Sequence, residues 1–158
     1  MFMNDFEIGL ATLSAAVYKY GVNLSNRIAN ENILSGLNAV ELLHTAPSSS
    51  GFEASAYSYD GKIVIAFAGT NTDEWQDIWA DIGIGLLGSL NAQVIEAAKF
   101  YLDIKAQYGD NIVFTGHSLG GGLASLMAVF FNRPATTFDE VSFRLAVTQE
   151  NLRPQLVH

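Results

Sequence analysis

Cysteine is absent from the 158-residue sequence, which excludes disulfide bonds and thiolate metal sites and leaves the redox compartment undetermined. Basic residues are scarce: eight Lys and Arg stand against sixteen Asp and Glu, for a formal net charge of −8. An acidic surface of this kind disfavours nucleic acid and anionic membranes as partners. It leaves neutral lipids and small esters open as ligands.

Long apolar runs are also missing. None approaches the roughly 18 consecutive apolar residues that a membrane-spanning helix needs. The first seven residues, Met1–Glu7, carry acids where a signal peptide would carry bases. We therefore expect a soluble protein with no transmembrane segment and no N-terminal signal peptide. The compartment stays undetermined, and secretion by a route that needs no such signal is compatible with the sequence.

The composition predicts a single globular domain over residues 1–158. Hydrophobic residues make up 49% of the chain and charged residues 15%, a profile that suits a well-filled core. The length is enough for one compact domain and too short for two. One clear break, Ala46–Gly51, separates a helical opening from a strand-rich middle.

Apolar periodicity predicts helices and strands that alternate along most of the chain. The expected helices cover residues 6–20, 27–43, 91–108 and 119–131. The expected strands cover residues 52–59, 62–68, 112–115 and 135–138. Between the first two strands, Asp60-Gly61 is a strong signal for a two-residue hairpin. The later alternation predicts an α/β fold with a mostly parallel sheet covered by helices on both faces.

A G-x-S-x-G motif lies between an expected strand and an expected helix, at Gly116–Gly120. This context is typical of a nucleophile elbow, a tight turn that presents a serine above the sheet. Side chains two residues before and after Ser118 would collide in such a turn, so Gly116 and Gly120 are required. Ser118 would then start a helix, where free N–H groups favour negative charge, and the N–H of Leu119 would face the oxyanion formed during acyl transfer. The alternative is a glycine-rich strand-to-helix turn without chemistry.

A second candidate segment, Phe67–Thr70, ends an earlier buried strand. Ligands gather at the carboxyl ends of parallel strands, and the second oxyanion donor of such enzymes comes from a loop after an earlier strand. Thr70 is placed to supply its backbone N–H and its hydroxyl. The alternative is a simple turn.

Taken together, these segments resemble the class 3 lipase family over about residues 52–138. The matching residues are Phe67–Thr70, Trp75, Asp77, Asp81 and Gly116–Gly121, in the family's order. The resemblance implies an α/β-hydrolase fold and hydrolysis of carboxylic esters of lipids, without metal or organic cofactor. It implies Ser118 as nucleophile, with Thr70 and the N–H of Leu119 as oxyanion hole. Residues 82–88 fall where these lipases place a lid, although a buried loop or helix turn fits them equally.

The departure from the family concerns the catalytic acid and base, which in these enzymes follow the serine in that order and lie well beyond the strand after the elbow helix. We expect this chain to lack the C-terminal part that carries them, and the α/β-hydrolase fold to be incomplete. Asp139 follows the strand after the elbow helix and is the candidate acid; the candidate base is His158. The alternative reading makes Asp139 the polar start of a helix. His117 is expected to pack in the turn, and His44 to end the second helix.

Three functional hypotheses remain at this point. The first is a lipase- or esterase-like serine hydrolase that works through an acyl-serine intermediate. The second is a non-catalytic module that binds a lipid or a partner. The third is a truncated, inactive fragment whose exposed sheet edge favours self-association.

Overall fold

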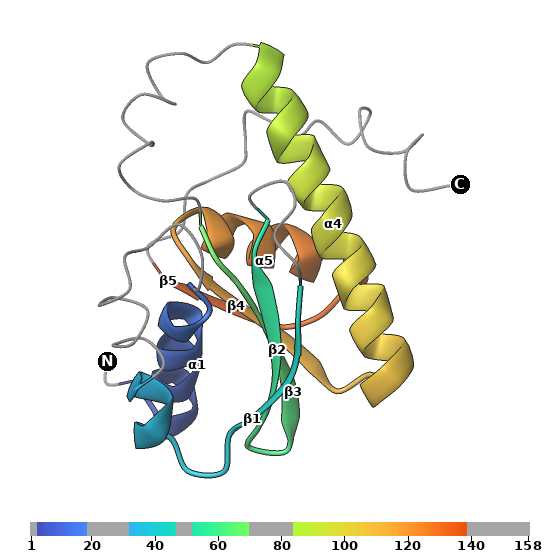
Figure 1. Ribbon diagram of the computed structural model, residues 1–158. Helices are drawn as coiled ribbons and strands as arrows, with labels where there is room; N and C mark the ends of the chain where they lie inside the picture. Colours follow the sequence, from blue (N-terminus) through green and yellow to red (C-terminus); the bar gives the residue numbers. More distant parts are fainter. Residues whose placement is uncertain (1–2, 19–31, 47–51, 70–83, 139–158) are drawn as a thin grey trace.

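The computed structural model describes residues 3–18, 32–46, 52–69 and 84–138, and Figure 1 shows their arrangement around one sheet. The strands of this part of the chain are β1 (Glu41–Thr45), β2 (Ala54–Tyr59), β3 (Lys62–Phe67), β4 (Ile112–His117) and β5 (Ala135–Phe138). The helices are α1 (Asp5–Ala16), the short 3-10 helix η1 (Leu34–Gly36), α4 (Ile84–Tyr108) and α5 (Leu119–Phe131). None of the described helices is both long and apolar enough to cross a bilayer.

The described sheet is mixed rather than mostly parallel as expected, with the strand order β1-β2-β3-β4-β5. β1, β2 and β3 pair antiparallel, whereas β3, β4 and β5 pair parallel. The β2–β3 hairpin is confirmed: Tyr59 pairs with Lys62, and both turn residues have positive φ, 49° for Asp60 and 71° for Gly61. Two consecutive residues of this kind form the turn whose twist matches that of the flanking strands.

Helix α1 covers one face of the sheet. It begins with a capping box, in which the Asn4 side chain accepts from the Glu7 N–H and the Glu7 carboxylate accepts from the Asn4 N–H. Leu10 and Leu13 are fully buried against β2, β3 and β4. The sheet also bonds the helix directly, because the Thr115 hydroxyl donates to the Leu10 carbonyl at 3.3 Å.

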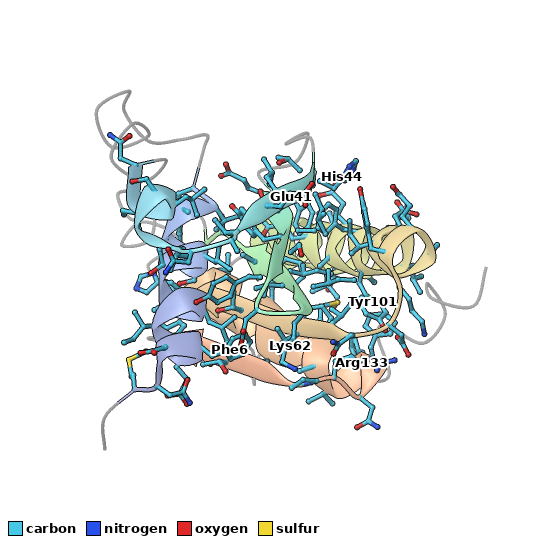
Figure 2. All side chains as sticks on the ribbon, turned by 90° about the horizontal axis from the view of Figure 1, so that it is seen from below. Phe6, Glu41, His44, Lys62, Tyr101 and Arg133 are labelled. Carbon is cyan, nitrogen blue, oxygen red and sulfur yellow. The ribbon has the colours of Figure 1, made fainter. Side chains whose placement is uncertain are left out.

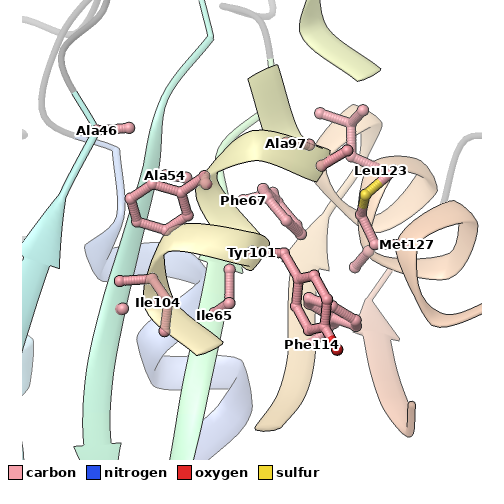
Figure 3. Packing of buried hydrophobic residues seen from close by; sticks show 14 of the residues in the cluster. Ala46, Ala54, Ile65, Phe67, Ala97, Tyr101, Ile104, Phe114, Leu123 and Met127 are labelled. Carbon is pink, nitrogen blue, oxygen red and sulfur yellow. The ribbon is translucent and has the colours of Figure 1, made fainter. Parts of the chain in front are cut away.

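Helices α4 and α5 cover the opposite face, over a core rich in aromatic rings (Figure 3). The ring centroids of Phe67 and Phe114 lie 5.9 Å apart, and those of Tyr101 and Phe114 lie 5.4 Å apart. Tyr101 also stacks on Phe131 at 4.1 Å. Such pairs contribute about 0.5–1.5 kcal/mol each beyond the burial of their area. The expected helices on both faces are therefore present.

The expected second helix over residues 27–43 is wrong at its carboxyl end. Glu41–Thr45 forms the edge strand β1, with Leu43 half-buried beneath α4 and its neighbours Leu42 and His44 exposed. Pairing with β2 decides the conformation, and this non-local interaction overrides local helical periodicity. His44 thus lies on a strand and stacks on Phe100, with centroids 5.8 Å apart. Residues 27–31 lie outside the described part of the chain.

Helix α4 begins at Ile84, earlier than the expected Asn91. Residues 84–88 of the segment at the lid position therefore form its first turns, and residues 82 and 83 lie outside the described part. In Figure 1 this end of α4 projects beyond the carboxyl ends of the parallel strands.

A cluster of polar side chains lies near the amino ends of β4 and β5, at the edge of the sheet opposite to the carboxyl ends. Arg133, which follows α5, donates to the Tyr101 hydroxyl at 3.3 Å and forms an ion pair with Asp110 (Figure 2). Lys105 lies 3.3 Å from the same carboxylate. The Arg133 guanidinium beside Asp110 holds the pKa of that carboxyl below its ordinary value of 3.8. The cluster joins α4, the turn before β4 and the turn before β5.

We predict that Asp110→Asn lowers the melting temperature at neutral pH, and that the difference from the wild type disappears in acid. Because the pKa of Asp110 is depressed in the folded state, its carboxylate stabilises the fold fully above the ordinary pKa of 3.8. This stabilisation is lost as the pH falls through the lower pKa of the folded state. Thermal unfolding of both proteins between pH 2.5 and 7 measures this. Asp103→Asn, at an exposed position on α4, is the control. A difference independent of pH would contradict the assignment to charge.

Candidate active site

The carboxyl ends of the three parallel strands lie level at one edge of the sheet. Phe67 at the end of β3 pairs with Gly116, and His117 at the end of β4 pairs with Phe138 of β5. Ser118 follows β4 directly and precedes the first residue of α5. Ligands of open α/β sheets bind outside this edge. Ser118 is therefore at the position where the fold offers a site, and it is partly exposed there.

Ser118 has the strained backbone that a nucleophile elbow requires. Its φ of 56° and ψ of −123° lie outside the regions that residues with a side chain ordinarily adopt. Strain of this kind costs on the order of 1–3 kcal/mol and persists only where the surroundings enforce it. Here the Ser118 N–H donates to the Phe138 carbonyl at 3.1 Å, and the Ser118 carbonyl accepts from the Gly122 N–H at 3.2 Å. β5 and α5 thus hold the turn from both sides.

The two elbow glycines are required by close backbone contacts. A Cβ on Gly116 would lie 2.2 Å from the carbonyl oxygen of Gly120. A Cβ on Gly120 would lie 2.0 Å from the carbonyl oxygen of Phe67. Since both obstacles are backbone atoms, no rotation of a side chain relieves them. The collision expected from the motif therefore occurs within the elbow for one glycine and between the elbow and β3 for the other.

The first turn of α5 points its N–H groups toward this edge. The N–H groups of a helix's first turn have no partner within the helix, and no side chain caps α5. Leu119 contributes the first of these groups, while its side chain is buried. The loop after β3 lies against it, because a Cβ on Gly69 would be 3.2 Å from the Leu119 nitrogen. The arrangement favours negative charge beside Ser118.

Sequence reasoning missed Tyr18, which follows α1 and reaches this site. Its hydroxyl accepts from the Gly69 N–H at 3.0 Å and donates to the His117 carbonyl at 3.3 Å. Burial raises the pKa of the phenol, the Gly69 N–H lowers it, and the charge of Glu53 raises it. No local pattern could have revealed these contacts, since they join residues 51 and 99 positions apart.

Thr70, Asp139 and His158 lie outside the described part of the chain, as do the family-matching residues Trp75, Asp77 and Asp81. Within the described part, no group of three or more His, Cys, Asp or Glu side chains could hold a metal ion.

Of the two described histidines, one lies on a distant strand and the other directly precedes Ser118 in the chain. His44 lies on β1, three strands from β4, which corresponds to roughly 14 Å at the usual strand spacing. His117 precedes Ser118 at the end of β4 and contributes its carbonyl to the bond from Tyr18. The distance therefore excludes His44 as the base that would activate Ser118.

Comparison with known proteins identifies the family to which the chain is related. A family model described as a Tle-like phospholipase domain matches residues 9–148. An extracellular phospholipase A1 of Serratia liquefaciens is 37% identical over 137 residues, which cover 84% of this chain and 41% of that protein. The chain thus spans about four tenths of this relative's length.

Solved lipases share the fold. The lipase of Rhizopus microsporus var. chinensis superposes with a TM-score of 0.54 at 20% identity, over 87% of this chain and 57% of the lipase. A deletion mutant of Rhizomucor miehei lipase in complex with its propeptide gives a TM-score of 0.54 at 17% identity, over 87% and 52%. The α/β-hydrolase class expected from the sequence is confirmed, and the chain corresponds to part of such a fold.

We predict that Gly120→Ala destabilises the protein by at least about 3 kcal/mol, the upper end of the usual cost of overpacking, because its Cβ meets the backbone of β3. Gly36→Ala is the matched control, since nothing lies within 4 Å of its Cβ position and its change should stay within about 0.5 kcal/mol. Urea unfolding of the two variants measures the difference. Equal stability would mean that the elbow and β3 do not pack as described.

Proposed function

The chain belongs to the Tle-like phospholipase domain family, and we propose that it forms the nucleophile-bearing part of an enzyme that hydrolyses carboxylic esters of lipids. The observation that carries this proposal is the left-handed backbone of Ser118 at the carboxyl edge of the parallel strands. A serine held in this way is exposed to substrate and stands at the amino end of α5. A strand-to-helix turn with no catalytic role would not require this strained backbone.

The proposed reaction is acyl transfer in two steps. The Ser118 oxygen attacks the ester carbonyl while a base takes its proton, and the carbonyl oxygen becomes an oxyanion. The N–H of Leu119 donates to that oxyanion, and we assign Thr70 as the second donor. The alcohol leaves with a proton returned by the base, and an acyl-Ser118 ester remains. Water then attacks this ester by the same route, which releases the fatty acid and restores the serine.

The roles of the acid and the base, like that of Thr70, are proposed from the sequence alone. Asp139 and His158 follow Ser118 in the order that this class of hydrolase uses. A serine without a base is a poor nucleophile, yet an oxyanion hole and substrate binding alone retain a rate enhancement over water of roughly 10³–10⁴. Labelling of Ser118 therefore distinguishes an activated serine from an unactivated one.

We propose phospholipids as the substrate class. The basis is the family and the phospholipase A1 from Serratia, which cleaves lipids of that class by its name. The net charge of −8 favours zwitterionic over anionic headgroups at the surface. Release of fatty acid from zwitterionic and anionic phospholipid vesicles, compared with a short-chain ester, tests both parts of this assignment.

Self-association is a further part of the proposal. β5 is the last strand of the described sheet, and on the neighbouring α5 the side chain of Val129 is 73% exposed. Strand edges and exposed apolar residues of this kind favour pairing with another chain. We expect sedimentation velocity to show oligomers that dissociate in Val129→Lys. A monodisperse monomer across micromolar concentrations would contradict this expectation.

We predict that a fluorophosphonate probe labels Ser118 and no other residue, and that Ser118→Ala abolishes both labelling and ester hydrolysis. Removing the nucleophile of a serine hydrolase lowers kcat by about 10⁶-fold. Mass spectrometry of the labelled peptide identifies the residue. Ser35→Ala, which removes an exposed hydroxyl from η1, serves as the control. Folded wild-type protein that resists the probe would favour a binding module instead.

A further inference from the structure

The hydroxyl of Tyr18 joins two segments of the site, the loop after β3 and the end of β4. It accepts from the Gly69 N–H at 3.0 Å and donates to the His117 carbonyl at 3.3 Å. Gly69 belongs to the loop after β3, and His117 is the last residue of β4 before the nucleophile. One side chain from the end of α1 therefore bridges the backbone on both sides of the proposed oxyanion site.

Gly69 permits this bridge because it has no side chain. A Cβ at this position would lie 3.0 Å from the Tyr18 hydroxyl, 3.2 Å from the Leu119 nitrogen and 3.3 Å from the His117 carbonyl oxygen. Each distance is shorter than most real Cβ contacts. The Tyr18 hydroxyl, the Leu119 nitrogen and the His117 carbonyl oxygen therefore all lie close to the Cα of Gly69.

The chemistry of the phenol suits a fixed link. Burial raises the pKa of Tyr18, and the nearby carboxylate of Glu53 raises it further, so the hydroxyl keeps its proton at neutral pH. A protonated hydroxyl can donate one bond and accept another at the same time. Glu53 itself is 6% exposed, and its carbonyl accepts from the Ala68 N–H at 2.9 Å. The loop is thus bonded at Ala68 to Glu53, the residue before β2, and at Gly69 to Tyr18.

We propose that Tyr18 is a positioning residue of the oxyanion site, which holds the Gly69 backbone at a fixed place beside the Leu119 N–H. The inference rests on the proposed function and adds a residue to it. Donors in an oxyanion hole act through their preorganised position relative to the charge that develops on the substrate. A shift of the loop by about 1 Å can cost about 10²-fold in rate, even when the residue that moves is remote from the chemistry.

The test is Tyr18→Phe in the protein expressed from its full reading frame. The variant keeps the ring and removes the hydroxyl. We expect kcat and the rate of fluorophosphonate labelling at Ser118 to fall together by about 10- to 100-fold, with KM for the ester unchanged. An interaction made only in the transition state has this signature.

Tyr108→Phe is the matched control. The Tyr108 hydroxyl also donates to a backbone carbonyl, that of Leu43 at 3.2 Å, but from the far end of α4. It removes a tyrosine hydroxyl far from the site and should leave kcat unaltered. Equal kinetic effects of the two substitutions, or a change confined to KM, would overturn the proposal.

Gly69→Ala gives a second route if Tyr18→Phe does not fold. Its Cβ displaces the hydroxyl from the same side, so kcat should fall by a comparable factor. In the double variant the two losses should overlap, because both break one link; full additivity would count against the link. If the wild type itself is not labelled at Ser118, the proposed function fails and this inference fails with it. If the wild type is labelled and Tyr18→Phe reacts equally fast, only the role of Tyr18 is refuted.

Discussion

The close approach of the elbow backbone to itself and to β3 is the constraint on which the rest of the site depends. Ser118 adopts a left-handed conformation that is unfavourable in isolation, so it must be imposed by its neighbours. Gly116 and Gly120 let the strand, the turn and the helix come within a distance that excludes any Cβ. The position of the serine is therefore determined by backbone contacts among β3, β4 and α5. Side chains in a core can change rotamer, whereas backbone atoms in close contact cannot move independently. The site is therefore held rigidly.

The two faces of the sheet support this turn in different ways. Toward α4 and α5 the core is aromatic, and Phe67 and Phe114 stack on the very strands whose ends form the site. Toward α1 the core is mainly aliphatic apart from the fully buried Tyr57, and it becomes polar at the carboxyl edge, where Glu53 is buried and Tyr18 is half-buried. Apolar packing holds the strands together, but contacts of this kind are not directional. Directed hydrogen bonds then orient the loop that those strands present.

Local features of the sequence are sufficient to predict those parts of the structure that are determined by contacts between residues close together in the chain. The motif at Gly116–Gly120 predicts the elbow because its glycines act within one turn, and the ends of α5 and β5 match the prediction to the residue. The strand β1 was mistaken for helix because only its partner β2 makes it extended. Tyr18 was overlooked for the same reason, since both of its partners are distant in sequence. Asp139 and His158 remain predictions, as neither lies in the described part of the chain.

A neutral phenol is the appropriate group for the place that Tyr18 occupies. A cation beside Gly69 would attract anions at all times, including the fatty-acid product, and so would stabilise more than the transition state. A carboxylate would repel the developing oxyanion, and at low effective dielectric this repulsion is strong. The protonated hydroxyl adds no net charge, yet it satisfies one donor and one acceptor of the backbone. Burial raises the pKa of this phenol further above its ordinary value of 10.0, so the hydroxyl is neutral at pH 7 and the positive end of α5 supplies the favourable field beside Ser118.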